Sequence, residues 1–313
     1  MKKVLITGGT GFIGSNFVNK FLELGDEVNL IVRPESNFWR IESVKSKTKL
    51  HLVDLTNAEE IERFIGNLRP QIILHFATYG AYQGREQDIK KTIDTNLLGT
   101  INLVNACSKI SFDCFINTGS SSEYGTKDKP MNENDLLEPN NLYGVTKAAA
   151  TIYCQSLAKK MELPLVTMRP FSVYGYFEEA GRLVPEVIKA YFKDEPPSLG
   201  TPSSVRDFVF VEDVIDAYLK AIENIHKVKS NIFNIGTGVQ SKIGDVAEIV
   251  GKIAGSKKEP VYSAIKPNQH EPKNWLADIS KARKMLDWSP KHSLQEGLIK
   301  TVSWFKENIY LYQ

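Results

Sequence analysis

The stretch Gly8-Gly9-Thr10-Gly11-Phe12-Ile13-Gly14 directly follows the apolar run Lys3–Thr7 near the start of the chain. A strand that leads through a glycine-rich turn into a helix presents backbone N–H groups at the helix N-terminus, where they can bind an anion. The glycines at 8, 11 and 14 allow a tight turn, close approach of the backbone to a pyrophosphate, and close packing of helix on strand. This stretch therefore predicts a dinucleotide-binding turn.

Short apolar runs continue along the chain from this turn and alternate with amphipathic stretches of helical period. Helices are expected from about Gly14, near Glu59, over 89–108 and over 143–161. The runs expected to be strands are KVLIT from Lys3, VNLIV from Val28, KLHLVDL from Lys49, QIILHFA from Gln71, DCFINTG from Asp113 and LPLVTMRP from Leu163.

Strands that are joined by helices need crossover connections, so they lie parallel in one sheet with helices on both faces. The sequence thus predicts an α/β fold with a doubly wound parallel Rossmann sheet. Beyond Phe171 the pattern breaks into shorter pieces with frequent prolines, which favours a smaller, loop-rich unit. We expect residues 1–170 to form the dinucleotide-binding domain, and residues 171–313 to form mainly a C-terminal α/β substrate-binding cap, with some segments returning to the first domain.

The composition argues against several classes of protein. With 39 basic and 37 acidic side chains the formal charge is +2, which gives no net field to attract nucleic acid or a membrane surface. Three cysteines without CxxC spacing and five scattered histidines predict neither a disulfide framework nor a metal site. No apolar stretch approaches the roughly 20 residues that a membrane span needs, so we expect a cytoplasmic protein.

Tyr143 and Lys147 form a YxxxK pair, and their spacing brings both side chains to one face of a helix. A nearby ammonium stabilises phenolate, and a cationic oxidised nicotinamide would add to that effect. When the cofactor is reduced and neutral, the tyrosine keeps its proton more readily and can donate it to a carbonyl oxygen as hydride arrives. The pair is thus a candidate acid/base group.

The TGxxGxxG form of the glycine loop, together with the YxxxK pair, resembles the extended short-chain dehydrogenase/reductase superfamily, and within it the NAD(P)-dependent sugar-nucleotide epimerases, dehydratases and reductases. The resemblance covers nearly the whole chain, including the motif Asn96–Thr100 and the tail Leu276–Leu298. It implies that Ser120, four residues before Tyr124, is the catalytic serine, with Ser121 as the next choice. It implies a cofactor site formed by Gly8, Thr10, Gly11, Phe12, Ile13, Gly14, Arg33, Asp54, Leu55, Phe76, Ala77, Thr78, Asn96, Thr118, Tyr143, Lys147 and Phe171.

Arg33 bears on the choice of cofactor. NAD-binding relatives carry an acid at the end of the second strand, and this chain has Arg33 instead, which could hold a 2′-phosphate bidentately. We therefore expect NADP(H) to be favoured over NAD(H), with Ser36, Asn37 and Arg40 close enough in sequence to contribute. Arg33 could instead be an exposed residue at a strand end. Asp54 and Asn96 could likewise serve only as a helix cap or a backbone anchor.

The second half carries the expected substrate site. Segments Arg169–Gly175 and Val205–Val214 are similar to those of sugar-nucleotide epimerases and reductases, in which an arginine at the position of Arg206 holds the diphosphate. Arg206 could instead form a surface pair with Asp207. Relatives also show a phosphate-contacting stretch that is absent here at 268–272, and Lys266 is the candidate to replace that contact. The substrate residues expected are Ser121, Ser122, Ser172, Arg182 and Arg206.

Dehydratase relatives have one or two acids directly after the catalytic serine, where this chain has Ser121 and Ser122, and Glu123 is expected to point elsewhere. The leading hypothesis is therefore NADPH-dependent reduction of a nucleotide-linked 4-keto sugar. The alternatives are a sugar-nucleotide 4-epimerase of the UDP-galactose or UDP-glucuronate type, and a non-catalytic nucleotide-sensing protein. By resemblance, the helices over 89–108 and 143–161 pair in a homodimer.

Overall fold

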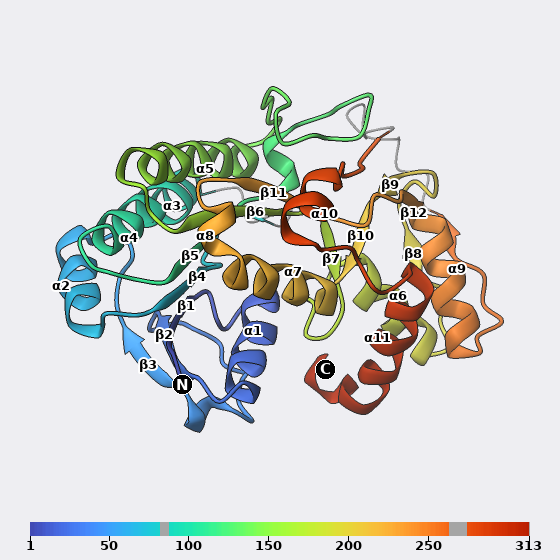
Figure 1. The fold of residues 1–313 in the computed structure, drawn as a ribbon. Coiled ribbons are helices and arrows are strands. Elements are labelled where there is room, and N and C mark those ends of the chain that lie inside the picture. The colour runs from blue at the N-terminus through green and yellow to red at the C-terminus, as the bar shows by residue number, and fades with distance from the viewer. Residues whose placement is uncertain (82–87, 263–273, 313) are drawn as a thin grey trace.

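The central sheet has seven strands, all parallel, in the order β11-β6-β5-β4-β1-β2-β3 (Figure 1). The computed structural model describes residues 1–81, 88–262 and 274–312. The strands of this sheet are β1 (Lys3–Thr7), β2 (Glu27–Val32), β3 (Lys49–Leu52), β4 (Ile72–His75), β5 (Cys114–Thr118), β6 (Leu165–Pro170) and β11 (Ile232–Ile235). The predicted doubly wound parallel sheet is confirmed, and the six strands expected from the apolar runs are all present.

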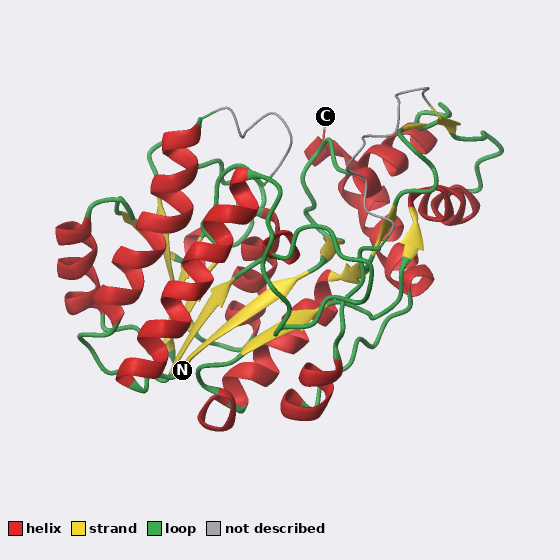
Figure 2. Cartoon of the chain, turned by 90° about the horizontal axis from the view of Figure 1, so that it is seen from above, coloured by secondary structure: helices red, strands yellow, loops and turns green. Residues whose placement is uncertain are grey.

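Both faces of the sheet are covered by helices (Figure 2). Successive side chains of a strand point to opposite faces. Val4 and Ile6 accordingly join the core beneath α1, whereas Leu5 joins the core on the opposite face. One face carries α1 (Phe12–Glu23) and α7 (Val211–Glu223), and the other carries α2 (Ala58–Leu68), α4 (Gly99–Cys107) and α5 (Leu142–Met161). This double burial explains why the strands read as continuous apolar runs.

The helix expected over 89–108 is interrupted. It consists of α3 (Ile89–Ile93), a π-helical turn (Asp94–Leu98) and α4. Single π-turns inside helices are uncommon and often occur at functional sites. In contrast, α5 is continuous from its N-cap Asn141, whose side chain accepts a hydrogen bond from the N–H of Gly144 at 2.7 Å. The YxxxK pair therefore lies on the first two turns of a regular helix.

The second half forms the smaller unit and also adds to the sheet. Strands β7 (Ser172–Tyr174) and β10 (Phe208–Phe210) pair in parallel, as do β8 (Ser198–Leu199) and β13 (Val261–Tyr262), while β9 (Val205–Arg206) and β12 (Ser241–Lys242) pair antiparallel. Its helices are α6 (Leu183–Phe192), α9 (Ile243–Ala254) and α11 (Leu294–Asn308). Four elements of the second half belong to the Rossmann unit instead: β11, α7, α8 (Ile225–Val228) and α10 (Ser280–Leu286). Short 3₁₀ turns span Lys45–Lys47, Ser121–Glu123 and Ile309–Tyr312.

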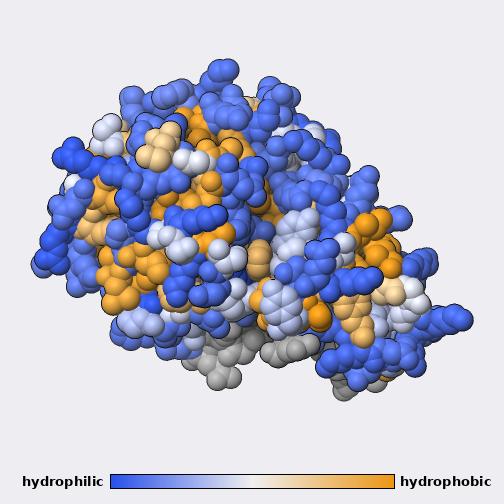
Figure 3. Space-filling model, turned by 90° about the horizontal axis from the view of Figure 1, so that it is seen from below, coloured by the Kyte–Doolittle hydropathy of each residue, from blue (hydrophilic) through white to orange (hydrophobic). Residues whose placement is uncertain are grey.

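The surface mixes polar and apolar side chains. On the face drawn in Figure 3, apolar patches are interrupted by hydrophilic residues. Within the described parts of the chain, no helix is long and apolar enough to cross a membrane. Leu98, Val145 and Ile152 are exposed apolar residues on or beside α4 and α5. The homodimer expected to form through these helices stays a prediction, as does the cytoplasmic location.

Candidate active site

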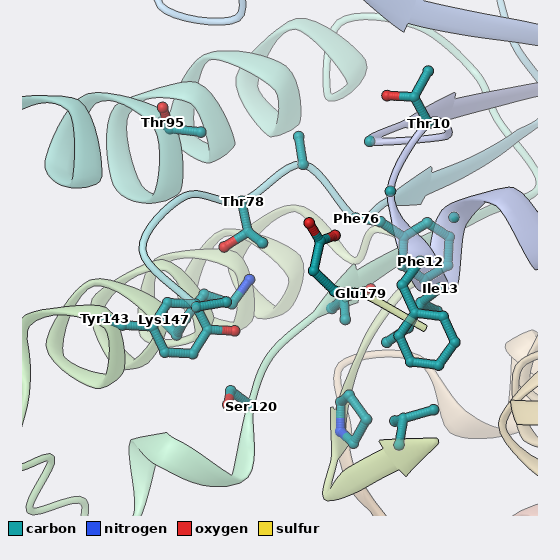
Figure 4. A pocket seen from close by; sticks show the side chains of 18 of the residues that line it. Thr10, Phe12, Ile13, Phe76, Thr78, Thr95, Ser120, Tyr143, Lys147 and Glu179 are labelled. Carbon is teal, nitrogen blue, oxygen red and sulfur yellow. The ribbon is translucent and has the colours of Figure 1, made fainter. Parts of the chain in front are cut away.

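A cavity of about 850 Å³ opens at the carboxyl ends of β1, β4, β5 and β6, against the smaller unit (Figure 4). Of the expected site residues that the structure describes, only Asn96 is absent from its lining. The others are Gly8, Thr10, Gly11, Phe12, Ile13, Gly14, Arg33, Asp54, Leu55, Phe76, Ala77, Thr78, Thr118, Ser120, Ser121, Ser122, Tyr143, Lys147, Phe171, Ser172, Arg182 and Arg206. The fold thus brings the expected cofactor and substrate residues to one place.

The glycine loop leaves room for an anion above α1. Gly8 has φ +68°, and a Cβ there would lie 2.7 Å from the backbone N of Ala77, so only glycine fits against the end of β4. A Cβ on Gly14 would overlap the carbonyl oxygen of Gly8. Gly11 is the N-cap of α1 and has no side chain to occupy the first N–H groups of the helix. These features fit the pyrophosphate of a dinucleotide.

Tyr143 and Lys147 enter the cavity from α5, and Ser120 enters from the segment after β5 (Figure 4). Lys147 is buried, and this burial lowers the pKa of its ammonium, although the carboxylate of Glu123 opposes the shift. The Ser120 hydroxyl oxygen accepts a hydrogen bond from the N–H of Ser122 at 3.1 Å. Its own proton can therefore be donated to a substrate oxygen. The three side chains supply a hydroxyl donor, a phenol and a cation.

Glu123 lies behind this group and does not line the cavity. Its Oε1 accepts from the N–H of Ser120 at 2.8 Å and from the Thr151 hydroxyl at 3.0 Å, and its Oε2 accepts from Arg169 Nε at 2.8 Å. Burial raises the pKa of the Glu123 carboxyl, and Arg169 opposes this shift. The expectation that Glu123 points away is met, but the cause is a 3₁₀ turn over Ser121–Glu123 rather than strand alternation.

The network behind Ser120 continues into the last strand of the sheet. Arg169 donates from an Nη to the Tyr124 hydroxyl at 2.8 Å, and Tyr124 donates to Oδ1 of Asn234 on β11 at 2.7 Å. Asn234 in turn donates to the carbonyl of Met131 at 2.8 Å. A buried ion pair whose remaining polar groups are satisfied fixes one local conformation. The loop that carries Ser120 is thereby tied to a strand more than 100 residues later.

Asn96 supports the cavity wall from outside. Its Oδ1 accepts from the N–H of Tyr79 at 2.7 Å and from the Thr78 hydroxyl at 3.0 Å, and its Nδ2 donates to the Tyr79 carbonyl at 2.8 Å and the Thr146 hydroxyl at 3.0 Å. These four bonds hold the loop after β4 against α5. The alternative role weighed for this residue, anchoring a backbone segment, therefore describes its contacts.

The surroundings of Arg33 make it a less favourable binding site for the 2′-phosphate of NADP(H). Its side chain is 52% exposed, and its Nε lies 3.4 Å from Oε1 of Glu35, which also lines the cavity. A carboxylate at this rim opposes a 2′-phosphate. Arg40 is nearly buried at 7% exposure and pairs with Glu179 at 2.7 Å. Its guanidinium is therefore already engaged across the cavity.

The remaining predicted residues have mixed surroundings. Asp54 accepts from the N–H and hydroxyl of Thr56 at 2.9 and 2.8 Å, so it closes a local turn while lining the cavity. Arg182 donates from Nε to Glu178 at 3.4 Å. Arg206 lies over the Trp275 ring at 5.6 Å, whereas the neighbouring carboxylate of Asp207 accepts from backbone N–H groups of 237, 238 and 277. Lys266 and 268–272 lie outside the described residues.

Several lining residues were not predicted from the sequence. They are Ile31, Val32, Glu35, Trp39, Val53, Thr56, Ala81, Thr95, Gly119, Asn140, Asn141, Pro170, Val173, Glu179 and Trp275. Asn141 carried a usable signal, because asparagine just before a helical stretch indicates an N-cap. Glu35 and Glu179 had no local signal, since their place in the cavity depends on how the loop after β2 meets the second half of the chain.

Comparison with known proteins decides the family. Residues 4–236 match the model of the NAD dependent epimerase/dehydratase family. The chain belongs to this family. A curated member, the UDP-glucuronate 4-epimerase of Thermodesulfobacterium geofontis, is 26% identical over 98% of this chain and 97% of that protein. The membership confirms the resemblance to sugar-nucleotide enzymes of the extended short-chain dehydrogenase/reductase superfamily and identifies the chain as an enzyme.

Solved structures of epimerase/dehydratase family members share the whole architecture. The UDP-glucose 4-epimerase of Thermotoga maritima with UDP-glucose has a TM-score of 0.88 and 29% identity, over 98% of this chain and 99% of that one. The UDP-glucuronic acid 4-epimerase of Bacillus cereus, in complex with UDP-glucuronic acid and NAD, has a TM-score of 0.86 and the same identity and coverage. These relatives do not support the predicted preference for NADP(H), and they favour the epimerase alternative over reduction of a 4-keto sugar.

Proposed function

We propose that this enzyme is an NAD-dependent 4-epimerase acting on a nucleoside-diphosphate sugar. The observation that carries the proposal is one cavity that combines a glycine loop fitted to a pyrophosphate with Ser120, Tyr143 and Lys147. The serines at 121 and 122 offer no acid for the loss of water, and Glu123 is committed to Arg169. The similarity of this chain to UDP-glucose and UDP-glucuronate 4-epimerases supports the same function.

The proposed mechanism assigns a task to each side chain. The glycine loop would hold a nicotinamide dinucleotide, which would supply the acceptor and donor of hydride for the two faces of sugar C4. Tyr143 takes the proton from the 4-hydroxyl and afterwards gives it back to the 4-keto oxygen. Lys147 lowers the cost of the phenolate. Ser120 donates its hydroxyl proton to the same oxygen and holds it within reach of Tyr143. Arg182 and Arg206 are the proposed diphosphate contacts.

Charge at the cavity rim supports NAD as the cofactor. Glu35 places a carboxylate beside Arg33, which favours ribose hydroxyls over a 2′-phosphate. The test is to release bound dinucleotide with acid, identify it, and titrate the emptied protein with NAD and NADPH. Tightly retained NAD, with conversion of a UDP-hexose to its 4-epimer in the absence of added cofactor, is the expected result.

Reduction of a nucleotide-linked 4-keto sugar remains the second candidate, because Arg33 lines the cavity at the end of β2. That reaction consumes one reduced dinucleotide per product. Stoichiometric loss of NADPH absorbance with a 4-keto sugar nucleotide, and no epimerisation without added cofactor, would replace the proposed function with this one.

A further inference from the structure

Arg40, on the loop after β2, joins the two halves of the chain over the cavity. One Nη donates to Oε2 of Glu179 at 2.7 Å, and its Nε donates to the carbonyl of Phe177 at 2.8 Å. Its other Nη reaches the carbonyl of Thr10 in the glycine loop at 3.5 Å. One side chain thus contacts the pyrophosphate loop and the segment 176–182, although Arg40 itself lies 137 residues before Phe177.

The segment 176–182 is held against the Rossmann half by further contacts. Asn16 on α1 donates to the carbonyl of Tyr176 at 2.9 Å. Phe177 adopts φ +63°, which a non-glycine residue rarely does, and its ring packs 6.1 Å from that of Trp39. Figure 4 draws the Glu179 side chain extending into the cavity. The segment therefore forms part of the wall that a dinucleotide would have to pass.

Arg40 and Glu179 lie at the cavity wall, where their charges can affect the exchange of a bound ligand. Arg40 is 7% exposed and Glu179 is 26% exposed, and both line the cavity. The pair joins the segment 176–182 to the loop after β2, so this segment can move away from the glycine loop only when the pair breaks. A buried, hydrogen-bonded charge pair is costly to break, which would slow that movement. An epimerase returns its hydride to the same sugar, so its cofactor has no need to leave between turnovers.

We propose that Arg40 and Glu179 form a clasp that closes the dinucleotide cavity and sets the rate at which the cofactor leaves. The proposal rests on the proposed function only for the identity of the dinucleotide. The clasp makes Arg40 and Glu179 positioning residues: they act on the 176–182 segment, and through it on cofactor release.

The test is a chase experiment on the full-length protein. Protein loaded with radiolabelled NAD is mixed with excess unlabelled NAD, and the label that stays bound is followed with time for the unmodified protein, R40Q, E179Q and the double variant. Each single variant is expected to release NAD about tenfold faster, and the double variant no faster than the singles, because the residues act through one contact. E27Q is the matched control, since Glu27 is 24% exposed and pairs with Lys49 at 2.8 Å at the sheet edge.

The outcomes separate the clasp from other roles. Release rates equal to that of E27Q in both single variants would overturn it. Faster release in R40Q alone would contradict a role for the Arg40–Glu179 contact and would indicate direct contact of Arg40 with the cofactor. If the protein binds NADPH instead of NAD, the chase is repeated with NADPH, so the proposed function can fail while the clasp stands. Binding of neither dinucleotide would overturn both. Melting temperatures are measured in parallel, so that a general loss of stability is recognised.

Discussion

Replacing Glu178 by glutamine should make the protein more stable at alkaline pH. Glu178 lies in the segment 176–182, and its Oε2 is buried without a hydrogen-bond partner among the described residues. Burial raises the pKa of the Glu178 carboxyl to about 7, although Arg182 opposes the shift. The folded state therefore binds this proton more tightly than the unfolded state does. The free energy of unfolding falls as pH rises from the ordinary glutamate pKa through 7, and the loss is complete by about pH 8.

The size of the effect follows from the shift. A displacement from 4.5 to about 7 corresponds to roughly 3 kcal/mol at 1.36 kcal/mol per pKa unit. E178Q should match the unmodified protein at about pH 4, below the ordinary glutamate pKa, and exceed it by up to about 3 kcal/mol at pH 8 in urea unfolding followed by tryptophan fluorescence. E307Q, which changes an exposed glutamate on α11, controls for the lost charge. A less stable E178Q at pH 8 would show that Glu178 is ionised and stabilised by Arg182, and would refute the reasoning.

Three further substitutions test the site. Y143F should lower turnover by about 10²-fold or more while NAD binding stays within about twofold, and unchanged turnover would contradict the acid/base role. G14A should weaken NAD binding by about tenfold or more, because its Cβ would overlap the glycine loop, whereas G66A, with open space around it, should bind normally. E123Q should lower the unfolding free energy by about 3 kcal/mol, because Arg169 loses its counter-charge, and a loss below about 1 kcal/mol in urea unfolding would argue against a stabilising ion pair.

Much of the Rossmann half could be predicted because its signals are local. Apolar runs such as Lys3–Thr7 are buried on both faces, and the YxxxK spacing matches the period of α5. The π-helical turn Asp94–Leu98 could not be predicted, since its hydrogen bonds span five residues instead of four and this small change leaves no mark in the apolar pattern. Strand β11 is a four-residue run whose membership in the sheet depends on pairing with β6, more than 60 residues earlier.

The cofactor preference could not be predicted from Arg33 alone. Arg33 stands at the end of β2 as expected, and on its own a guanidinium there favours a second phosphate. Glu35 follows two positions later and brings a carboxylate to the same rim, which weakens that local preference. Arg40, expected to help hold that phosphate, is engaged with Glu179 through a tertiary contact that no local pattern indicates.

The hydrogen-bond chain from Ser120 to Asn234 also determines how late in synthesis the serine loop can be braced. A ribosome delivers the glycine loop, Tyr143 and Lys147 long before Asn234 emerges. Until then Tyr124 lacks the acceptor on β11, and the Glu123 to Arg169 pair lacks the outer part of its support. A nascent chain that ends before β11 can pair its first six strands, but the serine loop is not yet braced. The last hydrogen bonds that support the serine loop can therefore form only after about three quarters of the polypeptide has been made.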